Sequence, residues 1–218
     1  MRILIADDHA VVRRGLEQIL ADAYPDIVCG EATNAEDAIQ SVDQDDWDVV
    51  ILDISMPGRS GLDALKEIKK MKPGLPVLVL SIHPEDQYAT RVLRAGASGY
   101  MTKETAPEEL LNAINKVVAG GKYVSAALAE KLAADLETEV GEAPPHKRLS
   151  DREYEVLLLI ASGNTISEIA EKLSLSVKTI STYRARILEK TGLKSNAALV
   201  QYAMTYGLVD WPPDRGRR

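Results

Sequence analysis

The sequence predicts two domains, an α/β domain built on a five-stranded parallel sheet followed by an all-α domain of about four helices. A length of 218 residues suits two domains of roughly 100 residues each. Up to residue 120, short apolar runs alternate with longer amphipathic segments, which is typical of βα units. From residue 149 onward the apolar residues recur at helical spacing throughout, which favours helices alone.

Five short apolar runs predict the strands of the sheet. They are ILIA (3–6), IVCGEA (27–32), VVIL (49–52), PVLVLS (76–81) and SGYMT (98–102). Continuously apolar strands are buried on both faces, and a helical crossover between neighbouring strands makes them parallel. We therefore expect a parallel sheet with helices on both sides.

Amphipathic segments between these runs predict the helices of the first domain. They cover residues 11–21, 35–41, 62–70, 87–95 and 107–118. A further helical stretch over 126–136 precedes ETEVGEAPPHKR (137–148), which is polar and contains two adjacent prolines. Such a segment does not pack by itself. We therefore expect the first domain over 1–122 and a partly helical linker over 123–148.

The remaining residues predict an all-helical domain over 149–210 and a flexible tail over 211–218. SDRE (150–153) and TISE (165–168) both match the capping-box pattern that begins a helix. The three-residue turn SLS (174–176) separates a short helix from a longer one. This spacing is typical of a helix-turn-helix, whose second helix enters the DNA major groove. Within that helix, Val177, Ile180, Ile187 and Leu188 are expected to face the core.

Composition excludes several classes of protein. Apolar residues make up 45% of the chain and charged residues 27%, and no apolar run approaches the ~20 residues of a membrane span. The N-terminal MRILIADD reaches two aspartates after four apolar residues, so it lacks the apolar region of a secretion signal. Cys29 is the single cysteine and cannot form an internal disulfide. We expect a cytoplasmic protein that does not enter a membrane.

Charge is distributed unevenly along the chain. Residues 1–124 hold 13 basic and 20 acidic residues, whereas residues 149–218 hold 10 basic and 8 acidic ones. Within the second domain, residues 176–194 carry five cations against Glu189 alone, a local charge of +4. A cluster of this kind could bind a polyanion, and it could equally be a solvated helix face.

Charged and polar side chains end the predicted strands. Asp7 and Asp8 follow the first strand, Asp53 the third, Ser81 ends the fourth, and the fifth leads to Lys103. Ligands of an open parallel α/β sheet gather at the carboxyl ends of its strands. Carboxylates that meet there repel one another unless a cation lies among them, and oxygen ligands of this kind suit Mg²⁺. A carboxylate beside such an ion is a competent nucleophile toward phosphorus, which makes Asp53 a candidate phosphoacceptor.

Four motifs carry a resemblance to a known family. ADDH (6–9), LDISMPGRSGLDAL (52–65), Ser81 after VLVL and GASGYMTK (96–103) stand in the order and spacing of a two-component receiver domain. Residues 1–120 thus resemble a flavodoxin-like (CheY-like) receiver.

The resemblance implies a set of site residues. A sensor histidine kinase phosphorylates Asp53 in such domains. The resemblance implies that Mg²⁺ is held by Asp8, Asp53 and the backbone carbonyl of Ser55, with Asp7 assisting through water. Ser81 and Lys103 bind the phosphoryl group, and Tyr100 is a switch aromatic that turns inward when Ser81 moves. We expect His83 to be an ordinary polar surface residue and His9 to lie near the rim of the site.

The second domain resembles a LuxR-type helix-turn-helix through LSDRE, SEIA, SVKTIS and LEKTGLKS. Together the two domains are similar to the NarL/FixJ class of response regulator. A helix face that combines small residues, hydroxyls and cations permits close approach to a DNA groove. The expected contacts with a double-stranded operator are Lys178, Thr179, Ser181, Thr182, Arg186 and Lys190. The resemblance also suggests self-association through Ala197, Val200 and Met204, which could equally be ordinary packing.

The sequence therefore predicts a phosphorylation-dependent, sequence-specific DNA-binding transcriptional regulator. It would be a homodimer when phosphorylated and would not turn over external substrates. One alternative is a phosphohydrolase with an aspartyl nucleophile. That chemistry usually needs a second carboxylate two residues after the nucleophile, where Ser55 stands. The other alternative is a signalling module whose helices bind protein or RNA.

Overall fold

A computed structural model describes residues 1–137 and 144–209. The chain divides into two compact units, Met1–Asp135 and Leu136–Arg218. The division falls inside the segment 123–148 that was expected to be the linker. The expected tail, 211–218, and part of the linker lie outside the described residues.

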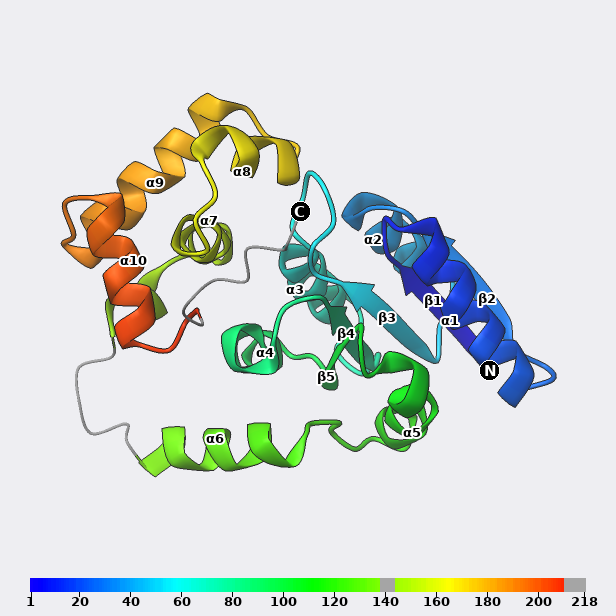
Figure 1. The fold of residues 1–218 in the computed structure, drawn as a ribbon. Helices are drawn as coiled ribbons and strands as arrows, with labels where there is room; N and C mark the ends of the chain where they lie inside the picture. Colours follow the sequence, from blue (N-terminus) through cyan, green and yellow to red (C-terminus); the bar gives the residue numbers. More distant parts are fainter. Residues whose placement is uncertain (138–143, 210–218) are drawn as a thin grey trace. The chain divides into compact units, whose positions relative to one another are not determined.

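The first unit contains the predicted five-stranded parallel sheet (Figure 1). Its strands are β1 (Arg2–Ala6), β2 (Val28–Ala32), β3 (Val49–Asp53), β4 (Val77–Ser81) and β5 (Gly99–Thr102). Their order across the sheet is β2-β1-β3-β4-β5, and every pair is parallel. The strand order reverses between β1 and β3, so their carboxyl ends border the crevice where α/β sheets bind ligands.

Helices cover both faces of the sheet, as predicted (Figure 1). They are α1 (Ala10–Ala23), α2 (Ala35–Gln44), α3 (Gly61–Met71), α4 (Glu85–Arg94) and α5 (Ala106–Val118). The helix α6 (Ala126–Glu137) follows them. α1 and α5 pack on one face of the sheet, while α2, α3 and α4 lie on the other (Figure 1).

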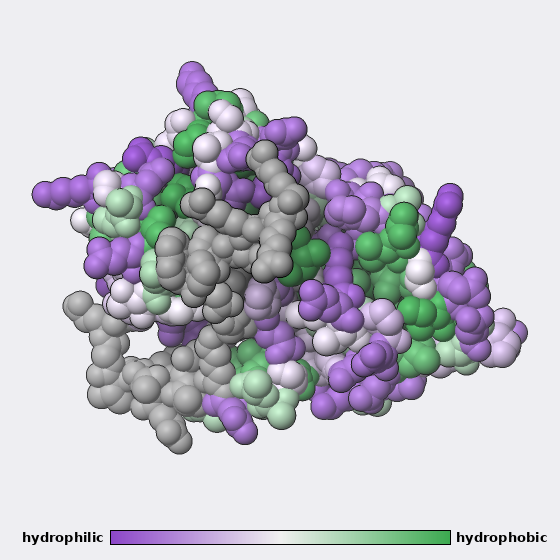
Figure 2. Space-filling view, viewed as in Figure 1, coloured by the Kyte–Doolittle hydropathy of each residue, from purple (hydrophilic) through white to green (hydrophobic). Residues whose placement is uncertain are grey.

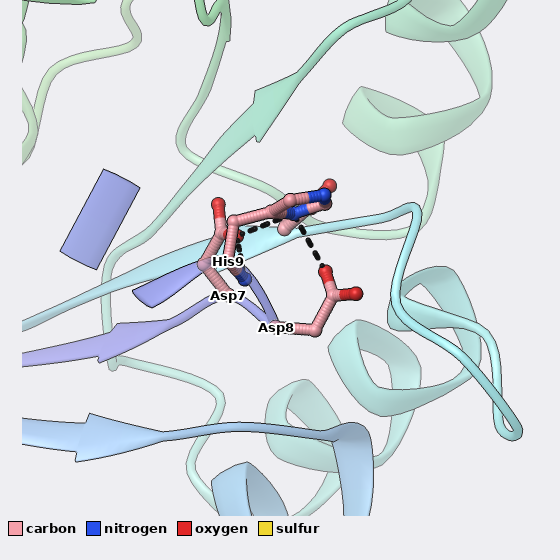
Figure 3. A group of neighbouring side chains, drawn as sticks. Asp7, Asp8 and His9 are labelled. Carbon is pink, nitrogen blue, oxygen red and sulfur yellow. Dashed lines mark hydrogen bonds and ion pairs between the residues drawn. The ribbon is translucent and has the colours of Figure 1, made fainter. Parts of the chain in front are cut away.

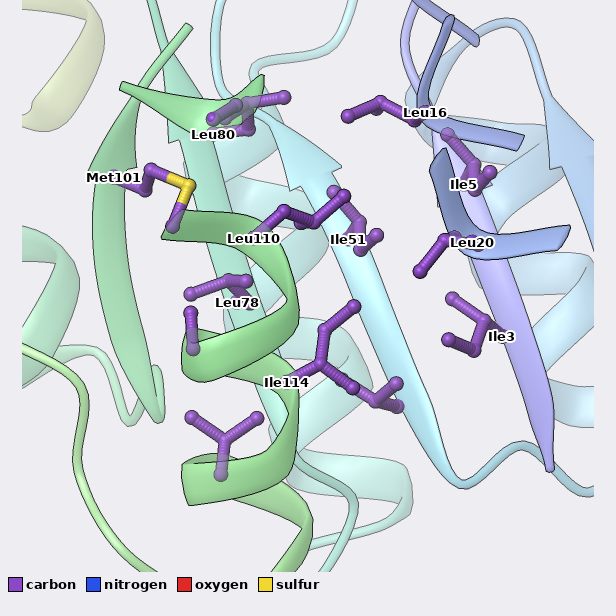
Figure 4. Packing of buried hydrophobic residues seen from close by; sticks show 14 of the residues in the cluster. Ile3, Ile5, Leu16, Leu20, Ile51, Leu78, Leu80, Met101, Leu110 and Ile114 are labelled. Carbon is purple, nitrogen blue, oxygen red and sulfur yellow. The ribbon is translucent and has the colours of Figure 1, made fainter. Parts of the chain in front are cut away.

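The core under α1 and α5 holds the strand ends in place (Figure 4). Ile3, Ile5 and Ile51 meet Leu20 of α1 and Ile114 of α5 there, and all are essentially inaccessible to solvent. Burying a side chain of this size contributes about 1.5 to 3 kcal/mol. The polar residues at the carboxyl ends of β1 and β3 are thus positioned by a closely packed core.

The second unit is all-helical, as predicted. It contains the 3-10 helix η1 (Pro145–Arg148) and the helices α7 (Asp151–Ala161), α8 (Ile166–Lys172), α9 (Val177–Thr191) and α10 (Asn196–Thr205). Both predicted capping boxes are formed at the starts of α7 and α8. The expectation that Val177 faces the core was wrong, because this side chain is 51% exposed. It is the first residue of α9, next to the N-cap Ser176, and the first buried residue of this helix is Ile180, one turn later.

In the described residues, no helix is long and apolar enough to cross a membrane. Figure 2 shows that hydrophilic residues dominate the visible surface and that hydrophobic residues gather in smaller patches. The most exposed large apolar side chains among the described residues include Val11 of α1 and Ile82, which follows β4.

Candidate functional site

Three aspartates meet at the carboxyl edge of the sheet. Asp7 and Asp8 follow β1, and Asp53 is the last residue of the adjacent strand β3. Ligand atoms of these aspartates and of His9 all lie within 4.8 Å of one another. The side chains of Asp7 and Asp53 are almost fully buried, whereas that of Asp8 is 28% exposed. We call Asp7, Asp8, Asp53 and the adjacent Lys103 the acidic pocket.

Lys103 joins two of the buried carboxylates. Its Nζ lies 2.6 Å from Asp7 Oδ2 and 2.7 Å from Asp53 Oδ2. Burial lowers the pKa of Lys103, but the adjacent carboxylates of Asp53 and Asp7 more than offset this, and the net pKa is raised. The ammonium therefore stays charged and compensates Asp53, at the sheet edge where the sequence placed both residues.

The negative charge of Asp53 is only partly compensated by Lys103. Burial raises the pKa of its carboxyl group, and the nearby Asp7 adds to the shift. Lys103 opposes it, as does the backbone N–H of Ser55, which donates to Asp53 Oδ1 at 2.8 Å. The start of α3 packs closely against the backbone of Asp53, and this needs Gly61, because a Cβ at that position would lie 2.1 Å from the carbonyl oxygen of Asp53. A further cation at the pocket would relieve the remaining charge.

His9 lies against the carboxylates rather than only near the rim (Figure 3). Its Nδ1 is 3.0 Å from Asp8 Oδ1 and 3.2 Å from Asp7 Oδ1, and its backbone N–H donates to Asp7 Oδ1. Arg13 was not predicted to be near the site. Its Nη1 donates to the carbonyl oxygen of Asp7 at 2.8 Å, and its Nε donates to Glu31 Oε2 at 2.6 Å. Arg13 lies on α1 four residues after the N-cap His9, and this spacing was the available signal.

The pocket fits a hard divalent cation. Its carboxylates offer more negative charge than Lys103 can neutralise, and their oxygens are close enough to share one ion. Oxygen ligands with this charge are those that Mg²⁺ prefers.

Ser81 and Tyr100 both contact the loop after β4. Both side chains are fully buried. Ser81 Oγ accepts a hydrogen bond from the backbone N–H of His83 at 3.0 Å, and the Tyr100 hydroxyl donates to the carbonyl oxygen of His83 at 2.7 Å. His83 is therefore not an ordinary surface residue, and that expectation was wrong. Its ring lies 4.7 Å from the ring of Tyr88, and burial lowers its pKa to about 4.

The predicted DNA contacts divide into two groups in α9. The side chains of Lys178, Ser181, Thr182 and Arg186 are exposed, and we call this set the basic face. Thr179 is half-buried, and its hydroxyl lies 2.8 Å from the hydroxyl of Ser176 at the start of the helix. The basic face combines cations and hydroxyls on one helix, which is the combination that phosphate contacts need.

Lys190 differs from the basic face because it has a buried partner. Its Nζ lies 2.6 Å from Oε2 of Glu153, whose side chain is only 3% exposed. Burial raises the pKa of Glu153, but Lys190 and Ser150 outweigh this effect and hold the pKa below its usual value. Lys190 thus links α9 to α7.

The residues proposed for self-association share a surface of α10. Ala197 and Met204 are exposed and Val200 is half-buried, whereas Leu199 and Ala203 of the same helix are fully buried. The three residues are therefore available to a partner.

Comparisons with known proteins match both units. Residues 3–115 match the response regulator receiver domain, and residues 147–203 match the luxR family of bacterial regulatory proteins. The chain is 38% identical over 210 residues to the response regulator GacA of Pseudomonas aeruginosa, covering 96% of this chain and 98% of GacA. It is 36% identical over 211 residues to the response regulator UvrY of Escherichia coli strain K12, covering 96% of each.

Solved structures of the response regulator RcsB are also similar to this chain over nearly its whole length. RcsB from Salmonella enterica serovar Typhimurium, bound to promoter rprA in the presence of a beryllofluoride phosphomimetic, has a TM-score of 0.61 and 32% identity. The match covers 94% of this chain and 99% of that one. A second RcsB–DNA complex has a TM-score of 0.56 and 31% identity, and it covers 96% of this chain and 99% of the other.

Proposed function

Since the chain belongs to the NarL/FixJ class of response regulators, which join a receiver domain to a LuxR-type helix-turn-helix domain, we propose that phosphorylation of Asp53 controls its binding to operator DNA. The protein is a phosphorylation-dependent, DNA-binding regulator of transcription. We assign residues 1–122 to the receiver, 123–148 to the linker and 149–210 to the DNA-binding domain. The observation that carries the proposal is the ion pair of 2.7 Å between Lys103 and the buried Asp53.

The reaction we propose is transfer of a phosphoryl group from a phosphohistidine of a sensor histidine kinase. An oxygen of Asp53 attacks phosphorus, a P–O bond forms, and the P–N bond to the kinase breaks. Asp53 must be ionised to attack, and burial keeps its pKa raised although Lys103 and the backbone N–H of Ser55 oppose the shift. Lys103 favours the ionised form and can then pair with a phosphoryl oxygen.

Mg²⁺ fits the same site. We assign Asp8, Asp53 and the backbone carbonyl of Ser55 as its ligands, with Asp7 acting through water. When bound, the ion would neutralise negative charge on the incoming phosphoryl group. The residues of the chain do the remaining work. Lys103 holds Asp7 and Asp53 together, and the backbone N–H of Ser55 orients the attacking carboxylate.

Ser81 and Tyr100 would report the new charge. Phosphorylation adds about two negative charges next to the end of β4. The Ser81 hydroxyl can donate a hydrogen bond to a phosphoryl oxygen, and Tyr100 is already buried against the same loop. We infer that Ser81 and Tyr100 move when this hydrogen bond forms, and that their movement changes the surface of the receiver over residues 82–122.

The basic face of α9 would bind the operator. We assign Lys178, Thr179, Ser181, Thr182, Arg186 and Lys190 to the DNA contacts. RcsB, which is similar over almost the whole chain, has been solved bound to promoter DNA with a phosphomimetic, and this supports the assignment. Lys190 would act mainly by fixing α9 against α7 through Glu153. We assign Ala197, Val200 and Met204 to a homodimer that forms on phosphorylation.

The protein would act as a switch and not as an enzyme with external substrates. Slow loss of its own phosphoryl group is expected. A general acid two residues after Asp53 would favour the phosphohydrolase alternative, but Ser55 has no acidic group. A DNA ligand and a single cysteine suit work in the cytoplasm.

A binding experiment tests the proposal. Genomic fragments captured by the protein with Mg²⁺ and beryllofluoride supply the operator, and gel shifts then measure its affinity with and without the phosphomimetic. We expect a clear increase in affinity for the wild type and none for Asp53→Asn. Asp26→Asn, an exposed aspartate of the same unit, is the matched control and should respond like the wild type. Equal responses of wild type and Asp53→Asn would contradict the proposal, and failure to capture any genomic fragment would favour the alternative module that binds protein or RNA.

A further inference from the structure

The chain that follows α5 is fastened to the free edge of the sheet. The backbone N–H of Tyr123 donates to the carbonyl oxygen of Ser98 at 2.9 Å, and the N–H of Tyr100 donates to the carbonyl oxygen of Tyr123 at 3.2 Å. Tyr123 thus continues the sheet beyond β5 by one parallel bridge to Gly99. The approach needs glycine, because a Cβ on Gly99 would lie 2.7 Å from the carbonyl oxygen of Tyr123.

A second attachment joins the start of α6 to the start of α4. The hydroxyl of Ser125 donates to the carboxylate of Glu85, the first residue of α4. The hydroxyl oxygen of Ser125 also accepts a hydrogen bond from the N–H of Leu128 at 3.1 Å. The carbonyl oxygen of Ser125 accepts one from the N–H of Ala129 at 3.0 Å. Ser125 therefore caps α6 while it is held by α4. We call residues 121–128 the strap.

The strap is attached to the residues that flank the phosphoryl site. Tyr100 uses its backbone N–H for Tyr123 and its hydroxyl for the carbonyl oxygen of His83. The N–H of His83 donates to Ser81 Oγ at 3.0 Å. Glu85 follows His83 by two residues, so a short segment of backbone joins Ser81 to the second attachment.

A cavity beside the second attachment leaves room for movement. Its volume is about 470 Å³, and it is lined by Pro84 and Glu85 on one side, Thr102 and Thr105 on another, and Leu128 of α6. Tyr123 is buried and paired with the sheet through its backbone, whereas Ser125 is half-buried, borders the cavity and is held by a side-chain hydrogen bond. Opening a half-buried side-chain hydrogen bond costs less free energy than separating buried backbone from a sheet, so the attachment at Ser125 is the one that can open first.

We propose that the strap is an internal reporter of the phosphoryl site, with its hinge at Tyr123 and its latch at the Glu85–Ser125 hydrogen bond. Ser81 Oγ turns toward a phosphoryl oxygen on Asp53 and leaves the N–H of His83. The loop 82–84 then moves into the cavity and draws Glu85 away from Ser125. The first turn of α6 loses its attachment to α4, while Tyr123 stays on the sheet. This inference rests on the proposed phosphorylation of Asp53.

Hydrogen exchange of single amides, followed by NMR on the full chain, tests the strap. In the wild type, Mg²⁺ with beryllofluoride should speed exchange of the Leu128 and Ala129 amides roughly fivefold or more, and leave the Tyr100 amide unchanged. Glu85→Ala should speed exchange of Leu128 and Ala129 without any phosphomimetic. Glu108→Ala, which removes an exposed carboxylate from the first turn of α5, is the matched control and should change neither amide.

Binding of beryllofluoride is followed separately by ¹⁹F NMR. If the wild type binds it and the Leu128 and Ala129 amides do not respond, the strap inference is wrong and the proposed function stands. Faster exchange at Tyr100 as well would also overturn it, because the hinge would have opened. If the wild type does not bind the phosphomimetic, the proposed function fails. The comparison of Glu85→Ala with Glu108→Ala then still decides whether the latch exists.

Discussion

The acidic pocket and the basic face of α9 hold their charges in opposite environments. In the pocket, the carboxylates of Asp7 and Asp53 are buried and share the ammonium of Lys103. On the basic face, Lys178 and Arg186 point into solvent. Charges in a low-dielectric interior interact strongly and shift one another's pKa, whereas exposed charges are screened by water and salt. The pocket can therefore store and report one added charge, while the basic face can bind a polyanion in a salt-dependent manner.

The largest effect is expected from Lys103→Ala. Loss of the ammonium removes the cation that keeps Asp53 ionised and that pairs with the incoming phosphoryl group. We expect phosphorylation by acetyl phosphate with Mg²⁺ to slow about 100-fold, measured by mass spectrometry of the intact protein over time. Lys72→Ala, which removes a lysine paired with Asp46 at the surface, is the control. A rate within threefold of the wild type would place Lys103 outside the reaction.

Lys190→Met tests whether Lys190 of α9, like Lys103 of the pocket, stabilises a buried carboxylate. The variant leaves Glu153 buried without its partner, which should destabilise the second unit by about 2 kcal/mol. The loss is smaller than for a fully buried ion pair because Lys190 is partly exposed to solvent. Hydrogen exchange of α7 amides measures this loss. The double variant with Glu153→Gln should recover part of it. If α7 is unaffected and only DNA affinity falls, Lys190 belongs to the basic face.

Arg186→Ala should have a smaller effect, on DNA binding alone. One exposed phosphate contact contributes about 1 kcal/mol, so operator affinity should fall roughly fivefold. The slope of log affinity against log salt should also decrease by about 0.9. Lys70→Ala, an exposed lysine of α3, is the charge-matched control. An unchanged salt slope for Arg186→Ala would remove this residue from the phosphate contacts.

The smallest effect concerns His83 at acid pH. Its pKa in the folded protein is about 4, below the ordinary value of 6.5, so the unfolded chain binds a proton first as the pH falls. The stability of the receiver unit should therefore decrease between about pH 6.5 and 4. The contribution of His83 is on the order of 1 kcal/mol after allowance for partial exposure. Hydrogen exchange of β4 amides in His83→Gln should show a weaker acid dependence than in the wild type. Identical profiles would contradict this.

Sequence patterns predicted the architecture well where a single element carries the signal. The five apolar runs became the five strands, and both capping boxes formed. Val177 was misplaced because helical spacing shows which residues share a side of α9 but not where along the helix its packing against the other helices begins. His83 was misplaced because its burial depends on Tyr88 and Tyr100, which approach it from α4 and β5.

The sequence by itself determined which chemical groups are present and on which strand or helix each one lies, because hydrophobic periodicity and capping are local properties. Only the tertiary structure decided which of them touch. The strand ends had placed Lys103 at the same edge as the aspartates, but the structure decided that it joins Asp7 and Asp53 at once. It also paired Lys190 with Glu153, and Ser125 with Glu85. These partners are far apart in the sequence, and their distances follow from strand order and packing, which no local pattern encodes.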